Sequence, residues 1–266
     1  MGRAWIGTMV KQSSSNAGRA AELLILLGQA GAKGLSLGAM AEACGEARSS
    51  VHRTLTALSD YGFVVQGGNR GSYRLGPAAF ALSLRTPSIN EIISTYQPAL
   101  IEATAKTNLS SYLMMRSGLD TICIANQMGE IFAQPYVSGI GGRIPLGVGV
   151  SGIIILGMME EKSFKRASDL LTPKWAEWGI TPENIAAEVA LYREQGHFCG
   201  IRRAHGIETL TMTIPLINDR WTGLEAAISL IAPLNVLGAE AQDDALSIIK
   251  DAIKAAETNA TDARKI

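Results

Sequence analysis

Between residues 48 and 56 the sequence gathers short hydroxyl and basic side chains, with no acidic residue before Asp60. The set is Arg48, Ser49, Ser50, His52, Arg53, Thr54 and Thr56. Such side chains donate hydrogen bonds to phosphate oxygens and to base edges. A surface helix usually mixes both charge signs on its outer face. This face of donors alone therefore predicts a helix that enters a groove of DNA.

A second group of donors flanks a predicted hairpin. Gly67-Gly68-Asn69 supplies residues that tolerate a positive φ at a tight turn, between two short strand-like runs. Arg70 and Arg74 lie beside this tip. We expect both to reach the DNA backbone or the minor groove.

The elements that must position these donors are helical. Apolar residues of the segment 37–44 recur at helical spacing, and Gly45 is placed to end that helix. We expect Ser49 or Ser50 to cap the next helix, whose apolar stripe is Val51, Leu55 and Leu58. A leucine-rich helix at 17–30 would pack behind them. The predicted order is helix, helix, turn, helix and wing.

The other candidate site lies where a glycine-rich loop, residues 138–149, meets an apolar helix predicted at 150–159. Helix N-termini attract carboxylates, because their first N–H groups lack partners inside the helix. We expect a small organic acid to bind there. The residues expected to contact it are Gly149, Val150, Ser151, Gly152, Thr211, Thr213 and Ser229. The alternative is that these glycines only permit tight packing.

The sequence gives weaker support for other kinds of functional site. The run 147–152 matches a dinucleotide-binding fingerprint, but it lacks the preceding strand and the later acidic residue. His197, Cys199 and His205 fit no specific zinc spacing. Arg202 and Arg203 could gate an anionic ligand, although a solvated loop is the favoured interpretation. We therefore predict no catalytic set, no metal and no cofactor.

Charge divides the chain of 266 residues. Residues 1–85 hold nine Lys and Arg against four acids, a net charge of +5, and the remainder carries −5. A basic head on an acidic body is typical of a DNA-binding module joined to a second domain. No apolar run is long enough to span a membrane, and the three cysteines look reduced, so we expect a cytoplasmic protein.

The second half mixes strands and helices. Hairpin strands are predicted at 109–115 and 121–127, a further strand at 131–137, and late strands at 209–217 and 223–231. Helices are predicted at 89–106, where Pro98 should kink or split the helix, and at 239–258. The fold class is α+β. Its predicted domains are a winged helix-turn-helix at 1–76, a linker helix at 77–88 and an effector-binding and oligomerisation domain at 89–266.

The segments Arg48-Ser49-Ser50-Val51-His52-Arg53-Thr54-Leu55, Gly62-Phe63-Val64 and Ser72-Tyr73-Arg74-Leu75-Gly76-Pro77 resemble the IclR family of bacterial transcriptional regulators. The resemblance implies a winged helix-turn-helix, a GAF-like effector domain, and dimers that often pair into tetramers. It also implies that Arg48, Ser49, Ser50 and Arg53 meet operator DNA, and that a small metabolite binds over the helix starting near residue 149.

The chain departs from the family in its pocket. Many members carry a cysteine in the penultimate strand, where residues 208–215 have none, and a second serine near Ser229, where Leu230 and Ile231 stand. No ligand is therefore transferred from a relative. Two function classes remain. One is a repressor or activator of a catabolic operon that reads a palindromic operator. The other is an enzyme that uses the glycine-rich loop and carries a DNA-binding head.

Overall fold

The computed structural model describes residues 15–67, 71–84, 87–137, 139–204, 206–218, 220–221 and 223–262. The chain divides into two compact units, residues 1–87 and 88–266. Each unit has a hydrophobic core of its own.

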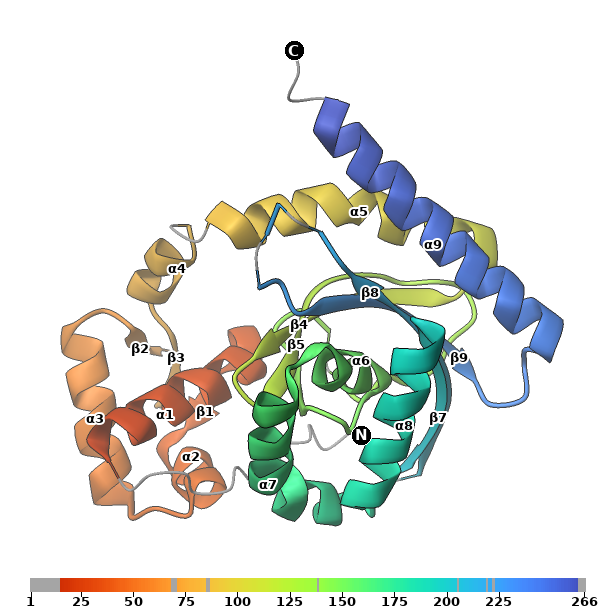
Figure 1. The fold of residues 1–266 in the computed structure, drawn as a ribbon. Coiled ribbons are helices and arrows are strands. Elements are labelled where there is room, and N and C mark those ends of the chain that lie inside the picture. The colour runs from red at the N-terminus through yellow and green to blue at the C-terminus, as the bar shows by residue number, and fades with distance from the viewer. Residues whose placement is uncertain are drawn as a thin grey trace. The chain divides into compact units, whose positions relative to one another are not determined.

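The first unit is a winged helix-turn-helix. Its elements are α1 (Asn16–Ala30), η1 (Gly31–Lys33), β1 (Leu35–Ser36), α2 (Leu37–Cys44), α3 (Arg48–Asp60), β2 (Val64–Gly67), β3 (Ser72–Leu75) and α4 (Pro77–Ser83). The wing is a three-stranded antiparallel sheet in the order β1-β3-β2 (Figure 1). The predicted helices and hairpin are confirmed, while the short β1 was not foreseen.

Apolar side chains from every layer of the first unit meet in one cluster. Its buried members are Leu23 and Leu27 of α1, Met40 and Ala41 of α2, Val51 and Leu55 of α3, Val64 and Tyr73. Val51 and Leu55 are one helical turn apart, so both point from the same face of α3 into this core. The opposite face of α3 is left to the solvent.

The second unit is built on a six-stranded antiparallel sheet in the order β6-β5-β4-β9-β8-β7. Its strands are β4 (Ser110–Ser117), β5 (Asp120–Gln127), β6 (Arg143–Pro145), β7 (Phe198–Ala204), β8 (Ile207–Leu216) and β9 (Ala226–Pro233). Its helices are α5 (Pro87–Thr107), α6 (Val150–Met158), α7 (Glu161–Glu177), α8 (Pro182–Gln195) and α9 (Ala239–Asp262).

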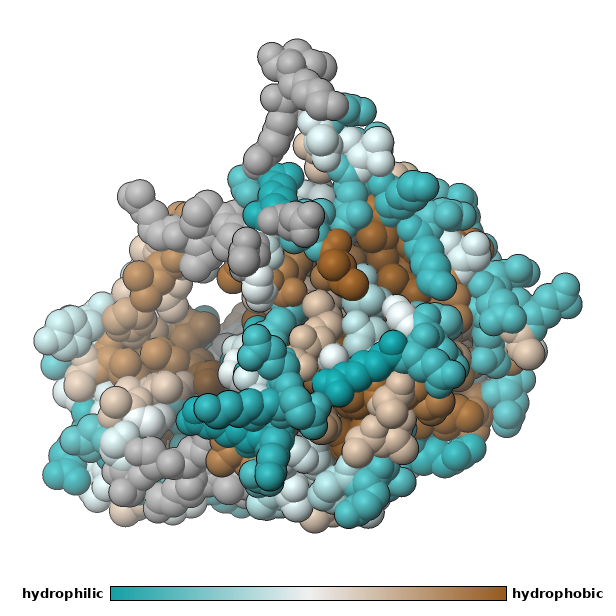
Figure 2. Space-filling model, in the orientation of Figure 1, coloured by the Kyte–Doolittle hydropathy of each residue, from teal (hydrophilic) through white to brown (hydrophobic). Residues whose placement is uncertain are grey.

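Helices cover both faces of this sheet (Figure 1). Leu113 points to the core shared with α5 and α9, whereas its neighbours Tyr112 and Met114 point to the core shared with α6, α7 and α8. The alternation follows from the two-residue period of a strand. The solvent side of α9 is largely hydrophilic (Figure 2), as expected for a helix that buries one stripe.

Four predictions are corrected. Residues 131–137 form no strand and make only an isolated bridge, Leu109 to Ile131. Pro98 lies inside one continuous helix, which it does not split. Residues 198–204, interpreted as a loop, form β7. The N-cap of α3 is Ala47, because the helix begins at Arg48, two residues earlier than a cap at Ser49 would require.

Candidate functional site

The start of α3 leaves both of its serines unused by the helix. The amides of Ser50 and Val51 donate to the carbonyl of Ala47, which opens the helix without a side-chain cap. Ser49 and Ser50 therefore stand in the first turn, and neither hydroxyl bonds to a group within the described part of the chain. Both remain available to an external acceptor.

The turn before α3 is set by Gly45. This residue adopts the left-handed conformation, with φ of 60°, and its N–H bonds to carbonyls of α2. The amide of Glu46 also reaches back to Ala41 at 3.0 Å. Its carboxylate then pairs with Arg19 of α1 at 3.3 Å, so the turn is tied to the helix behind it. The two helices are thereby held at a defined angle.

The solvent face of α3 carries the predicted donors. Arg48, Ser49, His52, Arg53 and Thr56 are exposed, and Ser50 and Thr54 are half-buried. The hydroxyls of Thr54 and Thr56 donate to carbonyls one turn earlier, which leaves their oxygens as acceptors. The guanidinium of Arg48 lies over Gly38, at the start of α2. The face can reach a DNA backbone and base edges together.

A groove of about 500 Å³ runs between α1 and α3. Arg19 and Arg53 line it from the two helices, and Tyr61 lines its end with 78% of its surface exposed. Two guanidiniums on one concave surface favour a phosphate backbone over an uncharged partner. The sequence analysis did not single out Arg19, because nothing in the sequence shows that α1 lies beside α3.

Of the two wing arginines that were predicted to contact DNA, the structure describes Arg74. Arg74 lies on β3, with its guanidinium against Gly67 of the neighbouring strand. Its Nε is buried and lacks a partner within the described residues. Arg70 lies outside the described residues, so the structure does not place it. The hairpin itself is confirmed by pairs from Val64–Leu75 to Gly67–Ser72.

In the second unit, the start of α6 is buried. Its N-cap is Gly149, and residues 150–156 are all buried. The indole Nε1 of Trp175 donates to the carbonyl of Leu146 at 2.6 Å, which anchors the loop before the helix. A Cβ at Gly152 would overlap the backbone nitrogen of Gly147. Gly152 therefore serves tight packing, which was the alternative role considered for these glycines.

A small cavity of about 40 Å³ lies at this helix start, and we call it the inner cavity. Five of the seven predicted effector contacts line it: Gly149, Val150, Ser151, Thr211 and Ser229. The apolar wall and the tyrosines that sequence reasoning missed are Tyr112, Met114, Tyr136, Val137, Ile144 and Ile231. The two remaining predicted residues lie elsewhere. Thr213 is fully buried opposite Ser229 on the neighbouring strand and shares a hydrogen bond of 2.8 Å with it, and Gly152 packs on Gly147.

Arg202 also lines the inner cavity, and the prediction that it lies in a solvated loop is wrong. It points inward from β7, and only 8% of the residue is exposed. Its Nε donates to the carbonyl of Val148 at 2.8 Å. Its two Nη atoms meet the carboxylate of Glu188 on α8 at 2.9 and 2.6 Å. Arg203, next along the strand, is exposed and pairs with Glu208 at 3.3 Å.

A second hollow, the outer cavity, opens beside the inner one and has a volume of about 310 Å³. Arg202 and Tyr136 line both cavities. Glu188, Asn184 and Trp178 line the outer one alone. The rings of Tyr136 and Trp178 meet edge to face at 5.7 Å. The volume of the outer cavity is within the range of small-molecule sites.

The described residues contain no group of three or more His, Cys, Asp and Glu side chains that could hold a metal ion. Of the three residues considered as ligands, Cys199 bonds to Gln242 at 3.4 Å, and His197 contacts the carbonyl of Gln195. His205 lies outside the described residues. Burial raises the pKa of the Cys199 thiol, which disfavours the thiolate that a metal requires.

Known proteins share both the sequence and the fold of this chain. Residues 17–68 match the IclR helix-turn-helix domain. The HTH-type transcriptional regulator Rv1719 of Mycobacterium tuberculosis is 29% identical over 227 residues, which cover 79% of this chain and 85% of that protein. The chain therefore carries an IclR-type helix-turn-helix domain and is similar over most of its length to transcriptional regulators of the IclR family.

Two solved IclR structures share the fold. A putative IclR regulator from Silicibacter has a TM-score of 0.71 at 22% identity, with 94% of this chain and 96% of that one covered. An IclR homolog of Microbacterium hydrocarbonoxydans, complexed with 4-hydroxybenzoate, also has a TM-score of 0.71, at 16% identity, with 93% and 99% covered. The predicted fold class, a winged helix-turn-helix joined to a GAF-like α+β unit, is confirmed.

The comparisons bear on the two function classes. The relatives are named as transcriptional regulators, which supports a DNA-binding regulator rather than an enzyme. The glycine-rich loop is consistent with this outcome, because Gly147 and Gly152 touch each other rather than a reaction space. Among the described residues, no helix is both long and apolar enough to cross a bilayer.

Proposed function

We propose that this IclR-type regulator controls a catabolic operon in the cytoplasm by binding a near-palindromic operator, and that a small organic acid in its second unit alters this binding. The observation that carries the proposal is the solvent face of α3. It holds exposed Ser49, His52 and Arg53, and it has no acidic side chain before Asp60. Such a face suits the major groove.

DNA contact would come from three places in the first unit. Arg48, Ser49, Ser50, His52, Arg53 and Thr54 of α3 would meet base edges and nearby phosphates. Arg19, beside Arg53 in the α1–α3 groove, would add a backbone contact. Arg70 and Arg74 would contact the backbone or the minor groove from the wing. These assignments rest on the exposure, charge and shared surface of the side chains.

The effector site would be the inner cavity together with the space beside it. Gly149, Val150 and Ser151 present the start of α6, where a carboxylate is favoured, and Thr211 and Ser229 add hydroxyls. Thr213 would hold Ser229 in place. A solved relative is complexed with 4-hydroxybenzoate, which is a small aromatic acid. This supports an organic acid as the class of ligand.

Self-association as a dimer, or as two paired dimers, would supply the symmetry that a palindrome requires. The linker helix α4 offers a surface for it, because Phe80, Leu82 and Leu84 are 58–66% exposed. Figure 2 shows apolar surface in the region of this helix. Two large exposed apolar side chains on a seven-residue helix, with a third at its C-cap, are typical of a contact with another copy.

The proposal is tested by fluorescence anisotropy of the full chain on DNA from its own upstream region, against scrambled DNA of equal length. We expect tighter binding to the upstream DNA, with an affinity that falls steeply with salt. A panel of small carboxylates, including 4-hydroxybenzoate, is then added, and one member should shift the affinity. Equal and weak binding to both DNAs would contradict operator recognition, and no response to any acid would contradict acid sensing.

A further inference from the structure

The inner cavity is too small to hold a metabolite alone. Its volume of about 40 Å³ is far below the roughly 300–1,000 Å³ of ordinary small-molecule sites. The outer cavity holds about 310 Å³ and lies on the far side of Arg202 and Tyr136. A ligand of ordinary size that uses the inner hydroxyls must therefore share the wall formed by these two side chains.

Arg202 is the charged group of that wall. Its Nε is held by the carbonyl of Val148, and one Nη also approaches the carbonyl of Gly147 at 3.5 Å. These bonds orient the guanidinium from the loop before α6. The paired Nη atoms then present a fork that matches a carboxylate in two-point contact.

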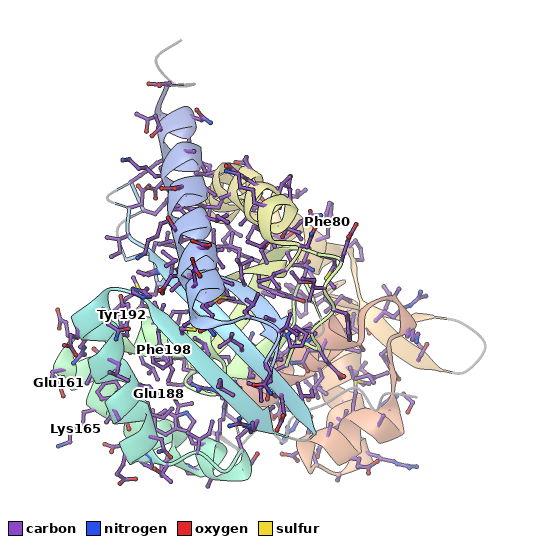
Figure 3. The ribbon with its side chains drawn as sticks, turned by 90° about the vertical axis from the view of Figure 1, so that its right-hand side faces the viewer. Phe80, Glu161, Lys165, Glu188, Tyr192 and Phe198 are labelled. Atoms are coloured by element: carbon purple, nitrogen blue, oxygen red, sulfur yellow. The ribbon has the colours of Figure 1, made fainter. Side chains whose placement is uncertain are left out.

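Glu188 now occupies this fork. The pair bridges β7 and α8, which lie alongside each other in Figure 3, where Glu188 is labelled. The Glu188 side chain retains 25% of its exposure, against 10% for Arg202. Glu188 is therefore the more exposed partner, and moving its carboxylate into water costs less free energy than moving the guanidinium of Arg202.

We propose that Arg202, rather than the N-terminus of α6, binds the carboxylate of the effector, and that Glu188 is an internal stand-in which the effector displaces. The apolar body of the acid then lies against Tyr136 and Trp178 in the outer cavity. Displacement removes the two bonds from Arg202 to α8, so effector binding loosens α8 from β7. The inference rests on the proposed acid-sensing function and identifies its anionic anchor and its moving element.

The test uses benzoate and its neutral analogue benzamide, titrated into the full chain by calorimetry. In Glu188→Gln the fork has lost its charged competitor, so benzoate should bind about tenfold tighter or more than to the wild type, while benzamide should bind equally. Glu194→Gln removes an exposed acid from the same helix without touching Arg202. This control should leave both affinities unchanged.

The double variant Arg202→Gln, Glu188→Gln keeps a neutral hydrogen-bonding pair and avoids leaving either charge unpaired. Compared with Glu188→Gln, the double variant should bind benzoate about tenfold or more weakly and should bind benzamide with the same affinity. Hydrogen exchange supplies a second readout, because benzoate should speed exchange of amides 183–195 in the wild type. Benzoate that binds the wild type and Glu188→Gln equally, or fails to bind either, overturns the inference.

The DNA assay separates the two proposals. If some carboxylate shifts operator binding by the wild type and by the double variant to the same extent, acid sensing stands and the role of Arg202 is refuted. If no carboxylate shifts operator binding by the wild type, acid sensing itself fails. Loss of the response in the double variant, with operator affinity retained in the absence of ligand, supports both.

Discussion

The hydroxyls of Thr213 and Ser229 share a hydrogen bond of 2.8 Å between adjacent strands β8 and β9. Thr213 is fully buried and Ser229 is 3% exposed, so each hydroxyl depends on the other for its partner. Ser229 also lines the inner cavity. The pair thus links the stability of the sheet to the position of a polar group in the candidate effector site.

Breaking this pair from one side should destabilise the second unit. We expect Thr213→Val to lower its free energy of unfolding by about 1–3 kcal/mol, because the Ser229 hydroxyl stays buried without a partner. Urea unfolding followed by tryptophan fluorescence measures the change. Adding Ser229→Ala to the same chain should recover part of the loss, since no polar group is then stranded. A double variant as unstable as the sum of the two single ones would contradict the coupling.

Arg53 should contribute to DNA affinity through its charge. We expect Arg53→Ala to weaken operator binding by about 1–3 kcal/mol and to lower the slope of log affinity against log salt by about one. Anisotropy at four salt concentrations gives both values. Arg166→Ala removes an exposed arginine from α7 in the other unit and should change neither. An unchanged slope for Arg53→Ala would show that this guanidinium does not meet phosphate.

Gly152 is predicted to tolerate no side chain. A Cβ there would overlap the nitrogen of Gly147, and the Cα and carbonyl carbon of Leu146 would lie 3.1 and 3.2 Å from the added Cβ. We expect Gly152→Ala to cost about 1–3 kcal/mol by overpacking, visible as a fall in Tm. Gly238→Ala is the matched control, because nothing lies within 4 Å of its added Cβ and its φ is not positive. A Gly152→Ala variant with the wild-type Tm would contradict this prediction, because it would show that the loop before α6 can move to accommodate the methyl group.

Cys123 should make stability depend on pH in the alkaline range. Burial raises the pKa of this thiol from 9.0 to about 12, so the folded chain keeps a proton that the unfolded chain releases above pH 9. Unfolding is therefore favoured as pH rises between about 9 and 12. Over that window the free energy of unfolding of Cys123→Ala should fall less steeply with pH than that of the wild type, and the difference in slope should correspond to close to one proton. Urea midpoints at pH 8, 9 and 10 measure it, and identical slopes in both proteins would contradict the raised pKa.

Burial should also protect the thiols of Cys44 and Cys123 from alkylation. The pKa of Cys44 is raised to about 11, chiefly by burial and also by nearby Glu22 and Glu46. At pH 8 the thiolate fractions of Cys44 and Cys123 are therefore small in the folded chain. We expect iodoacetamide to modify them far more slowly than in urea. Mass spectrometry of timed samples measures both rates, and rapid modification of the folded chain would contradict the prediction.

Local patterns were enough for the first unit. The helical spacing of apolar residues, Gly45 after α2 and the glycines of the hairpin are signals within a few residues of the structure they specify. The exception is the cap of α3. Serine is a good N-cap, but Ala47 takes that position because the fold places Val51 and Leu55 in the core, and this sets where the helix begins.

The role of Arg202 was beyond local patterns. The segment 197–205 mixes aromatic, glycine and basic residues, which reads as a loop, yet Phe198 and Arg202 share the buried face of an edge strand. A buried arginine is tolerable only because Glu188 and two loop carbonyls meet it. These partners lie 14 to 55 positions away in the chain, so no local period reveals them.

The sequence by itself determined the helix-turn-helix, the wing, the one-sided donor face of α3 and the α+β class of the second unit. Each depends on interactions between near neighbours, or on the identity of exposed side chains. Only the tertiary structure decided which polar residues share a cavity, that Thr213 pairs with Ser229 across adjacent strands, and that Arg202 is paired across β7 and α8. These relationships join distant segments, and their energies depend on distance and burial, which exist only once the chain has folded.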